Sequence, residues 1–476
     1  MKINNILKNK INKCIVRIIA EDININWNIP YLIKEPTKGQ GTGFFIDNNG
    51  HILTCSHVVN GAKNLYIEIP TLGSDKYECE VIGLCNEFDI ALIKCLKYKS
   101  KDYMELGDSD KLKIGMEVMV VGYPASYTVS SSNSNNLKFT VGIIKGQQRG
   151  LIETDSTINP GNSGGPLFYK DKIIGINSMK LVGESLENIG YAIPINYYKI
   201  IKSLFKDKII YRPDLLFNYN NTDKNLIKSL TNGSVDNGII VSEIYDSSPF
   251  KDTNIKKDSI ITSIDHFEID NYGLIQNYKW LDTNISMSVL VNKYKNNDTI
   301  KITYYNKNKK EECKIKLTPF IPPVRIIFPI FEKIPYIVIG GMIFMNFSEN
   351  HLINNQEKHL LKFYCISNDL NELLKPRLII SFIFPNTIVD KLNNVYENDF
   401  INKVNDINVS NINELKKALE KPIIINNKKY IKFEEEKGKS VIMLIKDIID
   451  QDILFSKIYN YPLNEFHQKY VKNFNK

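Results

Sequence analysis

The sequence predicts a mainly β protein, in which a barrel or a pair of barrels comes first and two small α+β domains follow. The chain has 476 residues, of which 43% are apolar and 24% charged, so it has the composition of a folded globular protein and the length of about three domains. Residues 39–194 are short β-branched runs separated by Gly, Asn, Asp and Pro, with hardly any helical period. A proline-rich stretch, residues 319–335, then separates two segments of mixed pattern.

The first elements belong to the β domain. Residues 1–38 are interpreted as an N-terminal extension and residues 39–206 as the β domain itself. Its expected strands are Gly43–Ile46, Leu65–Ile69, Glu80–Leu84, Ile90–Cys95, Glu117–Tyr123, Leu137–Ile144, Ile173–Ile176 and Gly190–Ile193. The polar stretch Ser126–Asn136 is expected to be a surface loop. Helical spacing returns at Tyr197–Phe205, which closes the domain.

Two smaller domains follow, at residues 207–320 and 321–476. The first has strand-like segments at Gly238–Ser242, Ser259–Ile264 and Thr299–Tyr305, and a helical segment at Thr222–Leu230. The second has strand-like segments at Leu378–Phe384, Phe400–Asn405, Lys429–Phe433 and Lys439–Ile445, and a capped helix at Asn411–Glu420. This content is compatible with two copies of one domain type.

Composition also bears on partners and location. The formal charge of +8 is spread along the chain, and the lysines of residues 307–310 stand beside Glu311 and Glu312, so specific nucleic-acid binding is disfavoured. The first twenty residues lack a signal-peptide core, and no apolar run reaches the ~20 residues of a membrane span. Seven scattered cysteines without a C-x-x-C pair indicate an intracellular, reducing compartment, the cytoplasm or nucleus, with an organelle as the alternative. A structural zinc site is not expected.

One glycine-rich stretch carries the strongest chemical signal. Residues 159–166 are Asn-Pro-Gly-Asn-Ser-Gly-Gly-Pro, and glycines around a serine allow a tight turn on which N–H groups converge. Ser163 is therefore the candidate nucleophile. The candidate oxyanion hole is the segment Gly161, Asn162 and Ser163, with the N–H groups of Gly161 and Ser163 as donors. A bare Gly-x-Ser-x-Gly is often only a β-turn, but the longer motif ahead of a strand argues against that interpretation.

A serine nucleophile needs a base, and the base needs an acid that orients it. His57 ends a β-branched strand beside small residues and is the candidate base, whereas His51 lies on a turn. Asp89 begins an apolar strand, so it is the acid least expected to be simply solvated, unlike the turn acids of residues 106–110. The order His57, Asp89, Ser163 is one of the chain orders of the serine-protease triad.

Together these motifs resemble the HtrA (Do-like, Deg) family of serine proteases. The matching stretches are Gly41–Ile46, Leu53–Val59, Phe88–Leu92, Leu106–Ser109, Val121–Pro124, Thr154–Pro166 and Asn188–Pro194. The resemblance implies a chymotrypsin-like double β-barrel followed by two PDZ-like domains, with no cofactor and no metal. It also implies a trimer, or a hexamer built from trimers. Pro335–Phe344 looks like the opening of the divergent second PDZ domain of the plant members.

The resemblance also assigns a specificity pocket and regulatory loops. By position, the pocket residues are Thr157, Ile158, Ser178 and Met179. Because Thr157 and Ile158 carry no charge, we expect cleavage after small or medium apolar residues. Residues 145–151 and 179–187 match the family's regulatory loops, and their polar, glycine-containing sequences predict that they need outside contacts to become ordered.

Three features depart from the family pattern, and the polar insertion Ser126–Asn136 is one of them. Cys55 and Ser56 stand where the family more often has Asn and Ala before the histidine. The ligand loop of the first PDZ domain usually has a glycine between two apolar residues, whereas Leu215, Leu216 and Phe217 include none. This argues against capture of a peptide C-terminus there and favours activation by packing between subunits.

The implied function is that of an ATP-independent serine endopeptidase which degrades unfolded or damaged proteins through an acyl-enzyme. The main alternative is a catalytically silent, PDZ-bearing chaperone or scaffold, against which the presence of all three triad residues argues. A hydrolase of small esters is disfavoured because the histidine precedes the serine, opposite to the α/β-hydrolase order.

Overall fold

The structure, a computed structural model, describes residues 5–124, 136–178, 189–354 and 369–474. The expected loop Ser126–Asn136, apart from its last residue, and the expected loop 179–187 lie outside these residues. The chain divides into two compact units. The first comprises Met1–Asp22 and Thr37–Ile321, and the second comprises Ile23–Pro36 and Pro322–Lys476. None of the helices in the described ranges is both long and apolar enough to cross a membrane.

The first six strands close into a barrel in the order β1-β2-β3-β6-β5-β4. The strands are β1 (Ile15–Ile25), β2 (Ile33–Phe45), β3 (His51–Cys55), β4 (Ala62–Glu68), β5 (Lys76–Cys85) and β6 (Ile90–Cys95). The short helix α2 (Ser56–Val59) follows β3 directly, and the 3-10 turn η1 (Pro70–Leu72) follows β4. The inward positions are apolar, and Phe44, Leu53 and Ile90 are fully buried or nearly so, which fills the barrel.

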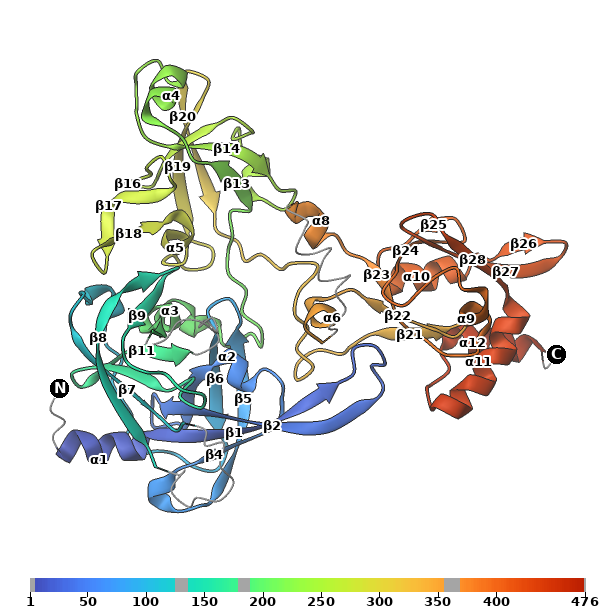
Figure 1. The fold of residues 1–476 in the computed structure, drawn as a ribbon, viewed down its shortest axis with the longest axis horizontal. Helices are drawn as coiled ribbons and strands as arrows, with labels where there is room; N and C mark the ends of the chain where they lie inside the picture. The colour runs from blue at the N-terminus through green and yellow to red at the C-terminus, as the bar shows by residue number, and fades with distance from the viewer. Residues whose placement is uncertain (1–4, 125–135, 179–188, 355–368, 475–476) are drawn as a thin grey trace. The chain divides into compact units, whose positions relative to one another are not determined.

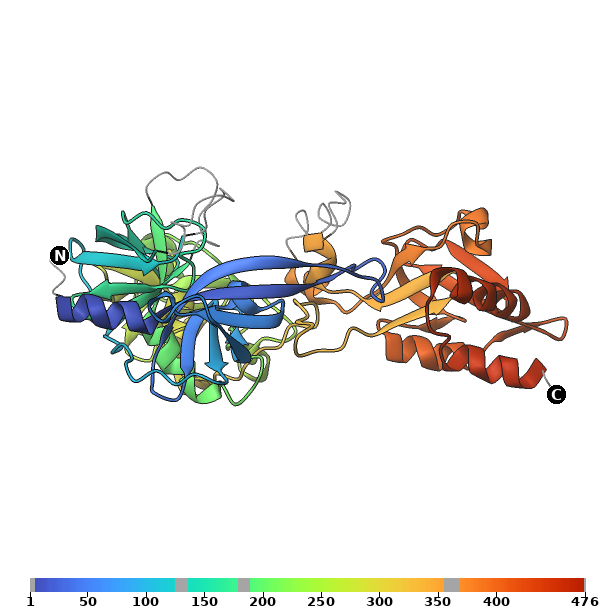
Figure 2. The ribbon, with the colours of Figure 1, turned by 90° about the horizontal axis from the view of Figure 1, so that it is seen from below.

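The barrel begins earlier than the sequence predicted. Helix α1 (Asn5–Cys14) leads into β1, which pairs antiparallel with β4, so the expected N-terminal extension of residues 1–38 supplies barrel strands. The pattern concealed this because residues 33–38 of β2 are exposed and polar or charged. Figures 1 and 2 show β1 and β2 side by side as a long hairpin. Its end, Ile23–Pro36, is part of the second unit.

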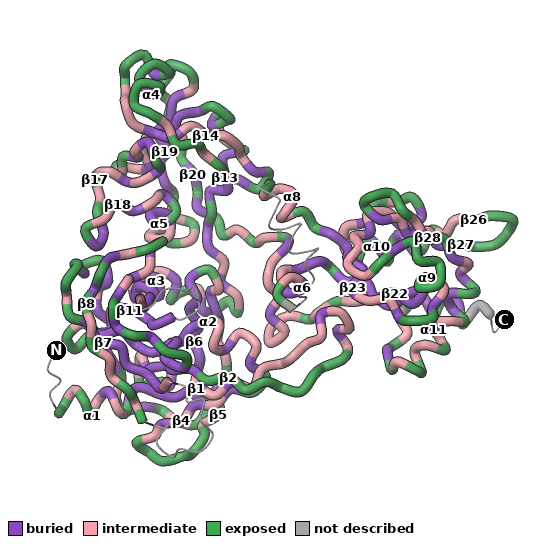
Figure 3. Tube along the Cα trace, in the orientation of Figure 1, coloured by how far each residue is buried: buried purple, intermediate pink, exposed green. Residues whose placement is uncertain are grey.

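A second closed barrel has the order β10-β11-β12-β9-β8-β7. Its strands are β7 (Glu117–Gly122), β8 (Lys138–Gln148), β9 (Leu151–Thr154), β10 (Pro166–Tyr169), β11 (Lys172–Ser178) and β12 (Gly190–Pro194). The 3-10 turn η2 (Ser109–Lys111) precedes it, and helix α3 (Ile195–Ile201) and turn η3 (Lys202–Leu204) follow. Figure 3 shows buried residues concentrated in the strands of both barrels. Two six-stranded barrels confirm the chymotrypsin-like prediction.

A small α+β domain completes the first unit. Its sheet has the order β13-β14-β15-β19-β20, with a separate hairpin β17-β18. The strands are β13 (Phe217–Asn220), β14 (Ile239–Ile244), β15 (Ile260–Ile264), β16 (Phe267–Glu268), β17 (Leu274–Trp280), β18 (Thr283–Ser286), β19 (Thr299–Asn306) and β20 (Lys309–Lys316). Its helices are α4 (Lys224–Leu230), η4 (Pro249–Asp252) and α5 (Met287–Val291). Because the sequence predicts a PDZ-like domain at these residues, we refer to it as the first PDZ-like domain.

The second unit is built on a sheet of order β21-β22-β23-β24-β27-β26. The strands are β21 (Tyr336–Ile339), β22 (Met342–Asn346), β23 (Leu378–Ile383), β24 (Phe400–Val404), β25 (Ile407–Asn408), β26 (Ile423–Ile425), β27 (Lys428–Glu435) and β28 (Ser440–Leu444). The helices are α6 (Glu349–Asn354), α8 (Leu370–Leu374), α9 (Ile388–Leu392), α10 (Ile412–Leu419), α11 (Ile445–Tyr459) and α12 (Glu465–Phe474). Asn411 caps α10 by accepting a hydrogen bond from the Glu414 N–H at 3.0 Å, as the sequence predicted.

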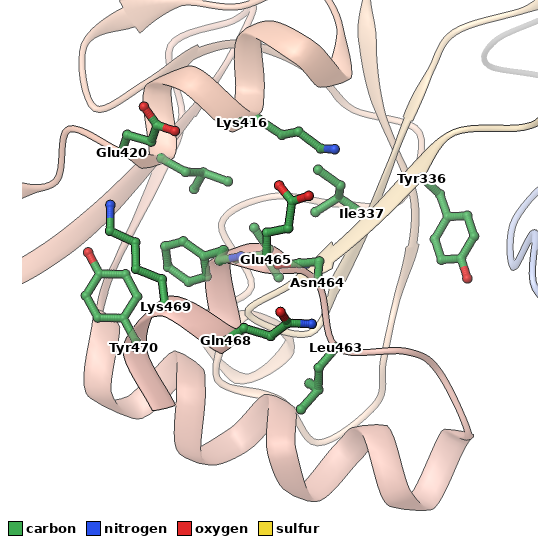
Figure 4. A pocket seen from close by; sticks show the side chains of 13 residues that line it. Tyr336, Ile337, Lys416, Glu420, Leu463, Asn464, Glu465, Gln468, Lys469 and Tyr470 are labelled. Atoms are coloured by element: carbon green, nitrogen blue, oxygen red, sulfur yellow. Dashed lines mark hydrogen bonds between the residues drawn. The ribbon is translucent and has the colours of Figure 1, made fainter. Parts of the chain in front are cut away.

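The hairpin β21-β22 is held by a buried carboxylate. Asp452 of α11 accepts hydrogen bonds from the N–H groups of Gly340, at 2.7 Å, and Gly341, at 3.1 Å. It also pairs with His467 of α12 at 2.9 Å, and both side chains are fully buried. A cavity of about 360 Å³ lies between β21, α10 and α12, and Figure 4 shows Ile337, Lys416 and Glu465 among the side chains that line it.

Candidate active site

The pairing of β3 with β6 brings the candidate base and acid together. Cys55, the last residue of β3, is opposite Ile90, the first residue of β6. His57 lies two residues after Cys55, in α2, and Asp89 lies one residue before Ile90. The Ser56 N–H donates to the Asp89 carbonyl at 3.0 Å, so the two chain ends are fixed to each other. The sequence places both residues at the same edge of the barrel because antiparallel strands end and begin side by side.

His57 and Asp89 form a closely bonded pair. The His57 Nδ1 atom lies 2.8 Å from Oδ2 and 3.0 Å from Oδ1 of Asp89, and the His57 backbone N–H donates to Oδ1 at 3.0 Å. The Asp89 side chain is 7% exposed, whereas that of His57 is 25% exposed. The arrangement holds the imidazole by one ring nitrogen and leaves part of the ring accessible.

The environment of Asp89 keeps it ionised. Burial by itself would raise the pKa of Asp89, but hydrogen bonds from the His57 side chain and backbone, the His57 charge and the Ser178 hydroxyl lower it below its ordinary value. Ser178 Oγ donates to Asp89 Oδ2 at 2.9 Å and is fully buried. An ionised carboxylate in this position can stabilise an imidazolium.

Ser163 follows a type II turn. The Asn162 N–H donates to the Asn159 carbonyl at 2.9 Å, and Gly161 has φ of +89°. Proline at the second position of a turn and glycine at the third, with positive φ, are the signature of type II, and residues 160 and 161 provide both. Turn type fixes which way the Pro160–Gly161 peptide faces, so the sequence determines the direction of the Gly161 N–H.

Buried polar contacts join this turn to the first barrel. Thr42 Oγ1 donates to the Gly161 carbonyl at 2.7 Å, and the Thr42 N–H donates to the Ser163 carbonyl at 2.9 Å. Gly164 is so tightly packed that an added Cβ would lie 3.0 Å from the Cys55 nitrogen and 2.1 Å from Thr54 Oγ1. Gly164, the residue after Ser163, therefore packs against the backbone of Cys55, two residues before His57.

The other expected site residues are placed as follows. Thr157 is exposed, and Ile158 is buried against Gly190, where an added Cβ would meet Ile158 at 2.9 Å. Ser178, expected in the specificity pocket, is bonded to Asp89. Met179 lies outside the described residues.

The expected ligand loop of the first PDZ-like domain has the backbone that a glycine would adopt. Leu216 has φ of +49°, in the left-handed region, which costs an L-residue roughly 1–2 kcal/mol. Tertiary bonds impose it, because the Tyr245 N–H donates to the Leu216 carbonyl at 3.1 Å and Ser248 Oγ donates to the Leu215 carbonyl at 2.6 Å. Both leucine side chains are buried.

The first PDZ-like domain also contacts the second barrel. The indole N–H of Trp280, which is 2% exposed, donates to the Ser109 carbonyl at 2.9 Å. Gln147, next to the β8-β9 turn, donates through Nε2 to Thr283 Oγ1 at 3.0 Å and accepts from the Gly150 N–H at 3.1 Å. The expected regulatory loop of residues 145–151 is therefore in contact with the hairpin β17-β18.

One group of side chains in the described residues brings metal-ligand atoms within 4.8 Å of one another, namely Cys55, His57 and Asp89. Burial and the nearby Asp89 charge raise the pKa of the Cys55 thiol well above its ordinary value. The thiol is therefore neutral and donates to the Asn177 carbonyl at 3.2 Å. A neutral, bonded thiol fits a packing role rather than metal ligation.

Sequence reasoning missed the contacts that Thr42 and Ser178 make. Thr42 lies between two glycines in the buried end of β2, and a polar residue in that place needs a partner. Ser178 ends the apolar strand β11 and is buried for the same reason. Both signals are present in the sequence, but neither names the partner.

Two family models match parts of the chain. A family model described as a trypsin-like peptidase domain matches residues 41–176, and one described as a PDZ domain matches residues 330–474. The "Serine protease Do-like HtrA" of Bacillus subtilis is 29% identical over 308 residues, which cover 60% of this chain and 64% of that protein. The "Probable periplasmic serine endoprotease DegP-like" of Chlamydia pneumoniae is 30% identical over 288 residues, or 57% of each chain. The match thus spans 64% and 57% of the lengths of these two relatives.

A solved structure shares the fold. The "HtrA-type protease AlgW with tripeptide" has a TM-score of 0.50 and 22% identity, and the match covers 67% of this chain and 98% of that one. The expected likeness to the plant members stays a prediction. The expected intracellular, reducing compartment is wrong, because relatives named periplasmic endoproteases point to an extracytoplasmic location. With a trypsin-like peptidase domain and a PDZ domain, the chain is a homologue of the HtrA/DegP serine proteases.

Proposed function

We propose that this chain is an ATP-independent serine endopeptidase of the HtrA type, which cleaves unfolded or damaged proteins in an extracytoplasmic compartment. The observation that carries the proposal is the doubly bonded pair of the partly accessible His57 and the buried Asp89, beside the type II turn that presents Ser163. The names of the homologous proteins support it.

The mechanism follows from the roles of these groups. Ser163 Oγ attacks the peptide carbonyl, and His57 Nε2 accepts the hydroxyl proton as general base. Asp89 accepts the Nδ1–H hydrogen bond, holds that tautomer and stabilises the imidazolium. The N–H groups of Gly161 and Ser163 stabilise the oxyanion.

His57 then protonates the leaving amine, which departs and leaves an acyl group on Ser163. Water attacks the acyl-enzyme with His57 again as base, and the serine is regenerated. Apart from the substrate and this water, the groups that act in both steps belong to the chain. The three side chains thereby complete an acyl-transfer cycle.

Labelling with a fluorophosphonate, together with casein turnover, tests the proposal. We expect Ser163 to be labelled in the wild-type chain, and we expect the Ser163→Ala protein to lose both labelling and turnover. A wild-type chain that is folded, unlabelled and inactive, but that suppresses aggregation of a client protein, would favour the silent chaperone instead.

We further propose that the first PDZ-like domain helps to order residues 145–151. Its Thr283 and Asn284 accept hydrogen bonds from Gln147, and this contact supports the proposal. Packing in a trimer, or in a hexamer built from trimers, would supply the remaining contacts. Gln147→Ala should lower casein turnover without lowering assembly size by light scattering. If Gln147→Ala kept full casein turnover, the hydrogen bonds of Gln147 would not be needed to order residues 145–151.

A further inference from the structure

Two buried cysteines face each other across neighbouring strands of the first barrel. Cys79 of β5 and Cys95 of β6 are partners in the antiparallel register. At the next position the Leu96 N–H donates to the Glu78 carbonyl at 3.0 Å, so Glu78 and Leu96 form the hydrogen-bonded type of pair. Hydrogen-bonded and non-hydrogen-bonded pairs alternate along an antiparallel ladder. Cys79 and Cys95 are therefore a non-hydrogen-bonded pair, the type in which side chains lie closest.

This geometry suits a disulfide. The Cα atoms of a non-hydrogen-bonded pair lie about 4.5 Å apart, within the range of about 4.4–6.8 Å that disulfides span. The Cys95 N–H donates to the Gly50 carbonyl on the opposite side of β6, at 2.9 Å, as expected for this pair type. No rearrangement of the backbone is required for the two sulfur atoms to bond.

The surroundings of the two thiols also favour their reaction with each other. The neighbouring Cys79 thiol is the largest cause that lowers the pKa of Cys95 to about 6; burial opposes it, and backbone N–H groups of Tyr98 and Lys97 add to it. The same contact and burial raise the pKa of Cys79. A thiolate beside a thiol is the state from which oxidation to a disulfide proceeds.

We propose that Cys79 and Cys95 are a redox site that a small peroxide converts into a reversible disulfide. The Cys95 thiolate attacks a peroxide oxygen, the O–O bond breaks, and a sulfenic acid forms. The Cys79 sulfur then attacks the sulfenic sulfur, the S–S bond forms, the S–O bond breaks, and water leaves with the Cys79 proton. With hydrogen peroxide, the two thiols lose two electrons and two protons, and the peroxide becomes two waters.

The size of the oxidant follows from burial. Cys79 and Cys95 are 7% and 2% exposed, so a peroxide can reach them more easily than a bulky disulfide such as oxidised glutathione. The bond would close the open end of the β5-β6 hairpin, whose turn at residues 86–89 ends with Asp89. The inference does not depend on the proposed peptidase activity.

Peptide mapping of the full chain tests the inference. The protein is treated with hydrogen peroxide, remaining thiols are alkylated, and the digest is analysed by mass spectrometry without reduction. We expect one linked peptide that joins Cys79 to Cys95, with a mass lower by two hydrogens than the sum of its parts, and we expect dithiothreitol to remove it. Cys85→Ser is the matched control, since Cys85 is fully buried on the same strand but faces Ile90, and it should leave the link intact.

Stability gives a second measurement. The link closes a loop of about 15 residues, so the oxidised wild-type chain should melt several degrees above its reduced form, and Cys79→Ser should show no such difference. The inference is overturned if both thiols are alkylated after peroxide treatment, or if Cys95 ends as a sulfinic acid. Because the link is read on the wild-type chain, the test stands even if the Cys79→Ser protein does not fold.

Discussion

Replacing Asp89 by Asn should remove most of the activity while leaving the fold in place. The carboxylate accepts from three donors: the His57 ring, the His57 backbone N–H and the Ser178 hydroxyl. An amide has one oxygen, so it can satisfy only part of this set. If the oxygen occupies the Oδ2 position, the NH₂ group meets the His57 backbone N–H, and two donors face each other.

In the other orientation the amide oxygen accepts from the backbone N–H, and the NH₂ group donates to Nδ1 of His57. The imidazole is then held in the tautomer with its proton on Nε2, which cannot accept a proton from Ser163. Known triads lose about 10⁴-fold in kcat on this change, which corresponds to about 5 kcal/mol in the activation barrier. We expect a loss of the same order.

Casein turnover measures this loss, and Asp47→Asn is its control. Asp47 and His51 form an equally close pair, with Nδ1 and Oδ2 2.7 Å apart, but on a half-exposed turn of the same barrel. Asp47→Asn should therefore leave turnover unchanged. If Asp89→Asn kept more than about a tenth of the wild-type kcat, Asp89 would not hold the tautomer, and the assignment of the triad would fail.

Three further predictions concern other sites. Peptide mapping should show cleavage after Val, Ile, Ala or Leu, because the uncharged, exposed Thr157 offers no counter-ion to a basic side chain; mainly Lys or Arg at that position would contradict it. Asp452→Ala should lower the free energy of unfolding of the second unit, measured in urea, by about 3 kcal/mol or more, because His467 and two glycine N–H groups lose their acceptor. The control Asp450→Ala, at an exposed position of the same helix, should change this free energy little. Burial lowers the pKa of His351 from 6.5 to about 4, so the unfolded chain binds more protons than the folded chain between these pH values. About 3 kcal/mol of folding stability should therefore be lost as the pH falls through that window. A urea midpoint that stays constant from pH 7 to pH 4 would refute this.

The sequence predicts the barrels well where turn residues separate short β-branched runs, as in β7 (Glu117–Gly122) and the strands that follow it. It misses the start of the first barrel, because a strand whose end leaves the barrel has no alternating pattern there. It predicts the triad by motif and order. It does not identify Thr42 or Ser178 as partners, since hydrogen-bond partners distant in sequence depend on tertiary packing.

Leu216 is the opposite case, because the sequence there predicts a larger change in the loop than its backbone conformation shows. The missing glycine predicted an altered loop, yet Leu216 takes the left-handed conformation. Hydrogen bonds to the carbonyls of Leu215 and Leu216 compensate the strain, and such compensation has no local signature.

The hairpin end at Ile23–Pro36 has a consequence for synthesis and for dissection of the chain. Trp27 is 5% exposed and packs edge-to-face on His351, while the Asn28 carbonyl accepts a bond from Ser381, 353 residues away in sequence. Such distant pairing is slow to form, so during translation this end must wait until residues as far along as Ser381 have left the ribosome. A fragment that begins at Pro322 would lack one wall of its own core, and adding residues 23–36 as a separate peptide should restore it.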